Sequence, residues 1–219
     1  MRLILIVLIG LFLLSTISFG YPTIYPEGVT IHEKDKTHGG FTLFAPVAGN
    51  TNGSGGTFYL IDMDGEIVHT WNTEYRPGLV GYLTDEGNLL YAGKTKAGFA
   101  PAHGKGGIIQ ELDKNSVVIW EYQNDQMHHD IFKMDNGNVL ALVWIPLPKE
   151  FNKKVRGGLF RTELNGKIWS EQIIEIAQNG SVTWSWVAHE WLDFDFHRIS
   201  PLESRKEWLH ANSVKHYPK

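Results

Sequence analysis

The chain has 219 residues, of which 42% are hydrophobic, and its formal charge at pH 7 is −4. Its basic residues are scattered, apart from a run at 149–156, so it lacks the basic surface that a nucleic-acid partner requires. The sequence contains no cysteine, which excludes disulfide bonds, thiol catalysis and a lipid-modified cysteine anchor.

The first 20 residues have the pattern of a secretory signal peptide. Arg2 precedes an apolar run at 3–14, and small residues stand at positions −3 and −1 of a cleavage site before Tyr21. The alternative is an uncleaved membrane anchor, although a membrane span usually needs about 20 apolar residues. The pattern predicts an exported protein, periplasmic or extracellular, with one domain at 21–219 and no stable membrane contact after cleavage.

Short β-rich runs then alternate with turn signals. The first predicted strand is 41–45, and the glycine-rich loop 50–56 leads into a second strand at 57–61. Farther along, residues 139–144 read as a buried strand that follows a tight hairpin turn. No sustained 3.6-residue apolar period occurs after the signal segment. The sequence therefore predicts an all-β fold with few helices.

Two sequence blocks recur along the chain. Residues 82–91 align without a gap with residues 132–141, fifty positions later. The second block is a turn signal followed by a β-rich run that ends in an aromatic residue. It occurs at 62–71, 113–122 and 177–186, so its copies are 51 and 64 residues apart. Such periods are typical of propeller blades, and the chain is long enough for a partial β-propeller of about four blades.

Aromatic residues recur at fixed positions of the predicted strands. They are Trp71, Trp120, Tyr122, Trp184 and Trp186. Aromatic motifs that recur once per blade usually pack between blades, so we expect a structural role for them. The basic segment 149–158 is expected to be a loop, either one that crosses a face of the propeller or a solvated insertion.

The candidate functional residues lie in two histidine-containing motifs. Because residues two apart on a strand share a face, His128 and Asp130 are predicted to lie on one side and His129 on the other. His210 and Asn212 repeat this spacing. The central channel of a propeller collects equivalent strand ends, so these histidines are expected to converge although they are far apart in sequence.

Two other interpretations of the histidines stay open. One is that they are hydrogen-bonded structural groups, and the other is that they bind a metal, since histidine is a common ligand. No cysteine or glutamate completes a metal-binding set at a recognisable spacing, so we expect no metal and no cofactor.

Several motifs together resemble the arylsulfotransferase (aryl-sulfate sulfotransferase) family. They are Tyr-Leu-Ile-Asp-Met-Asp-Gly at 59–65, Val-His-Thr-Trp at 68–71, His-His-Asp at 128–130, Asn-Gly-Asn at 136–138 and Glu-Trp-Leu-His-Ala-Asn-Ser-Val at 207–214. The likeness covers essentially the whole chain after the signal segment. The His-His-Asp and Trp-x-His-Ala-Asn-Ser-Val motifs are the specific ones.

The resemblance implies a six-bladed propeller that is usually exported in bacteria. Members of the family transfer a sulfuryl group from a phenolic sulfate ester to a phenol through a sulfated histidine, without the nucleotide donor PAPS. The resemblance assigns His128, His129 and His210 to catalysis. Asp130 and Asn212 would bind substrate.

One departure from the family pattern matters for activity. The family's active-site arginine and its nucleophilic histidine would lie beyond Lys219, so we expect this chain to be an incomplete and inactive copy. The alternative function is an exported, non-catalytic propeller that binds a ligand or a protein at its channel mouth.

Overall fold

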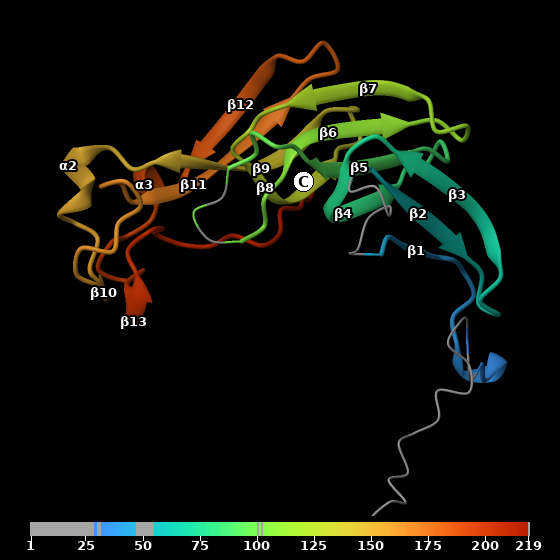
Figure 1. Ribbon diagram of the computed structural model, residues 1–219, viewed down its shortest axis with the longest axis horizontal. Coiled ribbons are helices and arrows are strands. Elements are labelled where there is room, and N and C mark those ends of the chain that lie inside the picture. Colours follow the sequence, from blue (N-terminus) through green and yellow to red (C-terminus); the bar gives the residue numbers. More distant parts are fainter. Residues whose placement is uncertain (1–28, 30–31, 47–54, 100, 102, 219) are drawn as a thin grey trace, which may run out of the picture.

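The computed structural model describes residues 29, 32–46, 55–99, 101 and 103–218. The predicted signal peptide lies outside these ranges. Three antiparallel sheets follow one another along the chain, as Figure 1 shows. Their strands confirm the predicted all-β fold. No described helix is long and apolar enough to span a membrane.

The sheets are built from successive strands. The first contains β1 (Thr42–Phe44), β2 (Gly56–Ile61) and β3 (Ile67–Thr73). The second contains β4 (Arg76–Leu83), β5 (Leu89–Lys94), β6 (Gly107–Leu112) and β7 (Val118–Gln123). The third contains β8 (Met127–Lys133), β9 (Val139–Pro146), β11 (Trp169–Ile176) and β12 (Val182–Val187), in that spatial order. Each sheet is ordered like a propeller blade, although the described residues close no ring.

The predicted repeat corresponds to a repeated hairpin turn. In the turn between the last two strands of the first sheet, Asp62 N–H donates to the Glu66 carbonyl and Gly65 N–H donates to the Asp62 carbonyl. The same pair of bonds closes the turns that begin at Asp113 and Ala177, each between the last two strands of its sheet. The three motifs therefore occupy equivalent positions, as the sequence predicts.

The other repeated block, at 82–91 and 132–141, forms the same kind of turn between the first two strands of the second and third sheets. Gly87 N–H donates to the Thr84 carbonyl, and Gly137 N–H donates to the Met134 carbonyl. Both glycines have φ near +80°, a conformation that a glycine adopts without steric cost and that such three-residue hairpin loops require.

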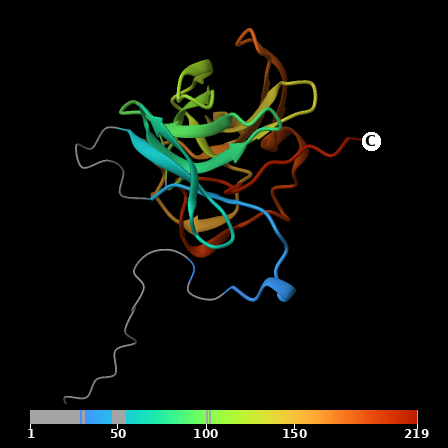
Figure 2. The same ribbon diagram turned by 90° about the vertical axis from the view of Figure 1, so that its right-hand side faces the viewer.

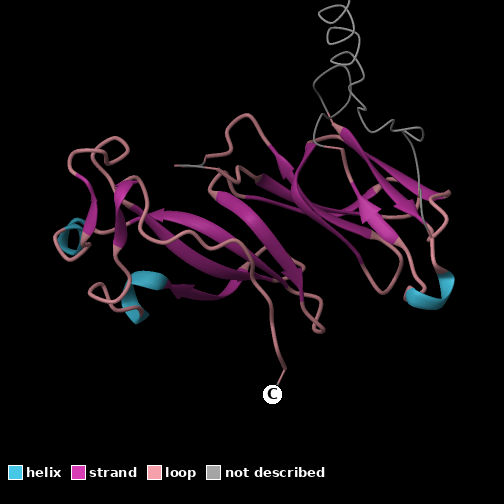
Figure 3. Cartoon of the chain, turned by 90° about the horizontal axis from the view of Figure 1, so that it is seen from below, coloured by secondary structure: helices cyan, strands magenta, loops and turns pink. Residues whose placement is uncertain are grey.

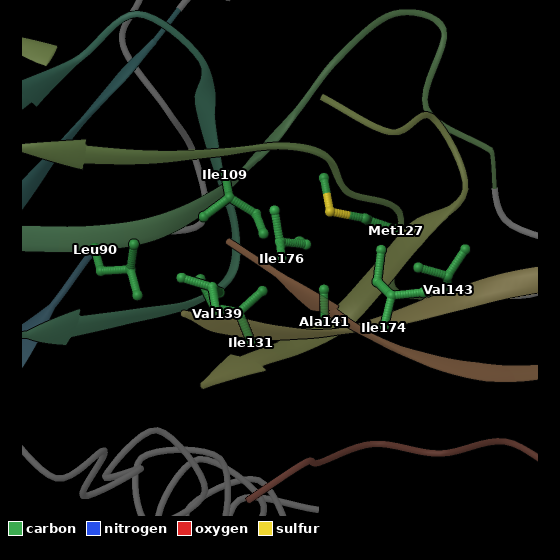
Figure 4. Packing of buried hydrophobic residues seen from close by; sticks show 9 residues of the cluster. All are labelled: Leu90, Ile109, Met127, Ile131, Val139, Ala141, Val143, Ile174 and Ile176. Atoms are coloured by element: carbon green, nitrogen blue, oxygen red, sulfur yellow. The ribbon is translucent and has the colours of Figure 1, made fainter. Parts of the chain in front are cut away.

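Two hydrophobic clusters hold neighbouring sheets together. Figure 4 shows the larger one, to which the second sheet contributes Leu90 and Ile109 and the third contributes Ile131 and Ile174. The smaller one joins the first and second sheets, around Trp71 and Tyr91. Strand β9 lies in the middle of the third sheet, and its first six residues are all buried. Its burial on both faces explains its continuous apolar sequence.

Two tryptophans join successive sheets by hydrogen bonds. The Trp71 indole N–H donates to the Asp113 carbonyl at 3.1 Å, and the Trp120 indole N–H donates to the Gln178 carbonyl at 3.0 Å. In both cases the donor is on the last strand of one sheet. The acceptor is in the turn between the last two strands of the next sheet. The predicted packing role is confirmed for these two residues. Trp184, on β12, is 48% exposed.

A small lobe extends the third sheet at one end. It contains α2 (Lys149–Asn152), β10 (Gly157–Leu159), α3 (Ala188–Trp191) and β13 (Ile199–Ser204), with β10 and β13 paired in parallel. Figure 3 shows these helices at one end of the molecule, and the short helix η1 (Lys34–Lys36) at the other. The segment 149–158, predicted to be a loop, thus folds into this lobe, where Val155 is buried.

The lobe fixes the start of the C-terminal segment. Trp208 is completely buried in it, and its indole N–H donates to the His197 carbonyl at 2.7 Å. From there the chain continues as an extended trace, drawn in red in Figure 2, and the Ala211 and Val214 N–H groups bond to carboxylates of the third sheet. This anchoring brings His210, two residues farther on, to the start of β8.

Candidate functional site

A bulge in β8 determines where the His-His-Asp side chains point. His128 pairs with Leu142 of β9, and Ile131 pairs with Ala141. His129 and Asp130 of β8 lie between these two pairs, whereas β9 has no residue between Leu142 and Ala141. His129 has a φ of +46°, which is unusual for a residue other than glycine. The prediction from strict alternation, that His129 would point away from His128, is wrong because bulges re-aim side chains.

Two glycines before the second sheet's third strand, Gly104 and Gly106, support this conformation. Gly104 accepts a hydrogen bond from His129 N–H at 3.1 Å, and Gly106 N–H donates to the Met127 carbonyl at 3.0 Å. A Cβ atom on Gly104 would lie 2.1 Å from Cε1 of His129, and the φ of Gly104 is +81°. Only glycine at position 104 therefore leaves room for the His129 ring in this orientation.

Three imidazoles form a continuous row at the start of β8. His128 Nδ1 lies 2.9 Å from His129 Nδ1, and His129 Nε2 lies 3.1 Å from His210 Nε2. The sequence predicts one site for these three residues, and the structure brings them together across 81 positions of the chain.

A glutamate stands at each end of the row. His210 Nδ1 lies 2.9 Å from Glu207 Oε1, within hydrogen-bonding distance. His128 Nε2 lies 3.0 Å from Glu171 Oε2, although the angle there is poor for a hydrogen bond. The five side chains therefore form one unbroken chain of polar contacts from Glu171 to Glu207.

The two ends of this row differ in burial. The side chains of His128 and Glu171 are 0% and 3% exposed, whereas those of His210 and Glu207 are 30% and 20% exposed. The Trp144 ring stacks on His128 with ring centroids 4.1 Å apart. The row thus leads from a dry interior to the surface.

Sequence reasoning missed both glutamates. Glu171 lies on β11, directly opposite Trp144 of β9, and its Oε1 accepts a hydrogen bond from Ala211 N–H at 2.9 Å. No local signal marks Glu171, because β11 also contains Ser170, Gln172 and Glu175. For Glu207 the available signal was the spacing of three residues before His210.

Asp130 is a structural carboxylate in this fold. Its Oδ1 accepts hydrogen bonds from the Tyr82 hydroxyl at 2.6 Å and from Ile131 N–H at 3.0 Å. Its Oδ2 accepts one from Val214 N–H at 2.9 Å. Asp130 therefore holds the C-terminal segment against β8, and both of its oxygens have protein partners.

Asn212 takes no part in the hydrogen bonds that link the histidine row. The residue is exposed, and the described residues from 207 to 218 form no strand, so the predicted strand alternation of His210 and Asn212 is wrong. The reason lies in the backbone donors of this segment. The N–H groups of Ala211 and Val214 bond to buried carboxylates instead of to a neighbouring strand.

The surroundings of the row shift two pKa values. Desolvation, aided by the neighbouring His128, His210 and His103, lowers the pKa of His129 to about 4. His129 is therefore neutral at pH 7. Burial raises the pKa of Glu207 above its ordinary value, against the opposing hydrogen bond from His210.

An open cavity of about 580 Å³ adjoins the exposed end of the row. Four of its lining side chains are cationic or can become so: His103, Arg198, Lys206 and His210. Glu203, Ser204 and Glu207 complete its polar lining. Within the described residues, no group of three or more His, Asp or Glu side chains is arranged to hold a metal ion.

The model of one protein family, described as Arylsulfotransferase (ASST), matches residues 28–219. The chain belongs to the arylsulfotransferase family. The match includes both histidine motifs and all three sheets. The family suggests aryl sulfotransferase activity and phenolic substrates for this chain.

Other comparisons add little to the arylsulfotransferase assignment. No curated protein matches the chain. Among solved structures, a protein of unknown function from Bacteroides caccae is 13% identical, with 69% of each chain covered and a TM-score of 0.24. A likeness this low carries no argument about the function of the arylsulfotransferase chain.

Proposed function

We propose that the histidine row binds the sulfuryl group of a phenolic sulfate ester and supports its transfer to a second phenol without a nucleotide donor. The observation that carries the proposal is the 3.1 Å approach of His129 Nε2 to His210 Nε2. Two imidazole nitrogens that converge on one point, next to an open cavity, are suited to contact a single oxygen atom.

The chemistry follows from charge. As the S–O bond to the departing phenol lengthens, negative charge grows on the sulfuryl oxygens and on the phenolic oxygen. Fixed donors aimed at such oxygens stabilise the transition state most strongly, because they need no reorientation during the reaction. His129 and His210 are fixed in this way, His129 by its bulge and by Gly104, and His210 by Glu207.

The roles within the proposed site differ from residue to residue. His129 and His210 contact the sulfuryl or phenolic oxygen, whereas His128 acts through His129. Asp130 positions β8 and the C-terminal segment. A sulfated histidine intermediate would split the transfer into two easier steps. Its nucleophile is assigned to none of these residues.

The proposal includes export. Residues 1–20 would act as a signal peptide, and the domain at 21–219 would function in the periplasm or outside the cell. The support is the sequence pattern of a basic residue, an apolar run and a small-residue cleavage site.

Binding of 4-nitrophenyl sulfate, measured by titration calorimetry, tests the proposal. We expect binding by the wild-type protein and a dissociation constant about 10- to 100-fold higher for His210→Ala, because a hydrogen bond to a charged group contributes roughly 1.5–3 kcal/mol. His38→Ala, at an exposed histidine, is the matched control and should bind like the wild type.

A transfer assay then separates the enzyme from a binding module. Release of 4-nitrophenolate that depends on an added phenol, with no nucleotide present, supports the transferase. Binding without release agrees both with the expected inactivity of an incomplete copy and with the alternative of a non-catalytic propeller that holds a ligand at this cavity. Absence of binding, or equal binding by His210→Ala, refutes both.

A further inference from the structure

The first sheet has one strand fewer than the other two. The turns that begin at Asp62 and Asp113 are equivalent, so β2 and β3 correspond to β6 and β7, and β1 corresponds to β5. The second and third sheets each begin with one further strand, β4 and β8. Within the described residues, the first sheet has no strand at that position and ends at β1.

The free edge of β1 is open. Its backbone groups from 41 to 45 bond to no described backbone outside β2, and the side chains of Phe41 and Phe44 are exposed. A cavity of about 370 Å³ is lined by residues of both β1 and β4, such as Leu43 and Val80. An open strand edge next to an apolar cavity can accept a further strand.

The C-terminal segment, residues 207–218, lies where a fourth sheet would begin. Strand β8 packs on the second sheet, where Ile131 shares a cluster with Leu90. The C-terminal segment packs on the third sheet in the same way, with Val214 in a cluster with Leu142. From 209 to 218 its backbone forms no hydrogen bond to other described backbone groups. The segment is thus a first strand without a sheet.

Two sheets separate β1 from the C-terminal segment of the same chain. Side chains alternate along a strand, so Leu89 of β5 faces the first sheet and Leu90 faces the third. Likewise, Ala141 of β9 faces the second sheet and Leu142 faces the C-terminal segment. Figure 1 shows the first and third sheets on opposite sides of the second. The open edge and the unpaired segment can therefore meet only between copies.

We propose that two copies of this chain assemble, with the C-terminal segment of each lying along β1 of the other as the first strand of that sheet. The contact continues the series of junctions that joins the first sheet to the second and the second to the third. A two-fold axis satisfies both open edges at once, so the assembly closes at two copies. The proposal goes beyond the proposed function, because it needs no substrate.

The repeat predicts which residue of the C-terminal segment donates to β1. In the third sheet, the bond from Met134 N–H to the Asn138 carbonyl, at 2.8 Å, joins the first strand to the second beside the turn. The His-x-Asx spacing at 128–130 recurs at 210–212, so residue 216 corresponds to Met134. His216 N–H is therefore the donor at this position.

Strand β1 supplies the matching acceptor. Thr42 lies opposite the residue that precedes the last turn of its sheet, as Val139 does in the third sheet. Phe41, one residue earlier, corresponds to Asn138. The carbonyl of Phe41 in one copy therefore accepts a hydrogen bond from His216 N–H of the other.

Engineered disulfides test this register, because the chain contains no cysteine. Lys215 lies opposite Thr42 in a pair without hydrogen bonds, where Cα atoms are about 4.5 Å apart, and a disulfide accepts that spacing. Full-length Thr42→Cys and Lys215→Cys proteins are purified separately, mixed and oxidised. We expect a disulfide-linked dimer in the mixture and none in either variant alone. Thr42→Cys mixed with Lys114→Cys, at an exposed turn, is the matched control and should give none.

Sedimentation velocity of the full chain measures the assembly directly, and we expect twice the mass of one chain. His216→Pro removes the N–H that bonds to Phe41, so the dissociation constant of the dimer should rise about tenfold or more. The backbone of His216 has no partner among the described residues of its own copy, so the fold of one copy should persist. His216→Ala keeps the N–H and should assemble like the wild type.

Three results overturn the proposal. One is a protein that stays monomeric at the highest concentration measured. Another is a dimer that forms no mixed disulfide, or that links through Thr42→Cys alone, which would mean that two β1 edges pair with each other. The third is an open chain of three or more copies. None of these measurements uses a sulfate ester, so the assembly and the proposed function can fail separately.

Discussion

The Tyr82 hydroxyl donates to Asp130 Oδ1 at 2.6 Å and so joins the first strand of the second sheet to the first strand of the third. Burial, together with the neighbouring carboxylate, raises the pKa of Tyr82 far above its ordinary value, so the hydroxyl remains a donor. Tyr82→Phe should lower the free energy of unfolding by about 1.5 kcal/mol, the usual value for a bond to a charged group. Urea denaturation measures this loss, and Tyr217→Phe, at an exposed ring, should show none.

Gly104→Ala should disrupt the site locally. The new methyl group would collide with the His129 ring, and alanine disfavours a φ of +81°. Gly87→Ala is the control, because Gly87 has nearly the same φ of +80° with no atom within 4 Å of its hypothetical Cβ. Both variants should lose about 1 kcal/mol from the backbone conformation. Only Gly104→Ala should also weaken 4-nitrophenyl sulfate binding, and equal binding by the two variants would contradict this explanation.

The stability of the protein should depend on pH through His129. Its pKa is lowered in the folded state from an ordinary 6.5 to about 4, so below pH 6.5 the unfolded chain binds a proton that the folded protein does not. The free energy of unfolding should therefore fall as the pH falls from about 6.5 to about 4. His129→Gln should reduce the slope of this decline, measured by urea titrations across that range. The same substitution at exposed His38 should leave the slope unchanged.

Trp120→Phe should weaken the junction between the second and third sheets. The substitution keeps an aromatic ring but removes the N–H that donates to the Gln178 carbonyl. A loss of about 1 kcal/mol in unfolding free energy is expected. Trp184→Phe, at a 48% exposed ring, should change stability little, and a similar loss in both variants would mean that the indole hydrogen bond is unimportant.

The sequence predicts the repeated turns well because their signal is local. An Asp or Asn near the start of each turn, with glycine in four of the five turns at the position of positive φ, fixes the hairpin within a few residues. Position 116 departs from this rule. Ser116 adopts a φ of +64°, and its hydroxyl accepts a hydrogen bond from Asn72 N–H of the first sheet.

The site is predicted only in part, because its geometry depends on distant contacts. Sequence spacing and the family resemblance place the three histidines in one site, but alternation gives the wrong side for His129. The bulge is stabilised by Gly104, some 25 residues earlier in the chain, and no local signal in 127–133 reports it. Glu171 escapes notice for the same reason, since its importance arises only when β11 packs beside β9.

The indole bonds of Trp71 and Trp120 have a consequence for how the molecule comes apart. Each reaches forward to the turn of the following sheet, so these bonds couple only adjacent sheets. Stability in such an array is a sum of unit and nearest-neighbour terms, and a unit at the end of the array shares one junction instead of two. Within the described residues, the first sheet is such a unit. In a single copy, unfolding that starts at this end should therefore begin with β1–β3 and continue through the second sheet. It should reach the histidine row, in the third sheet, last.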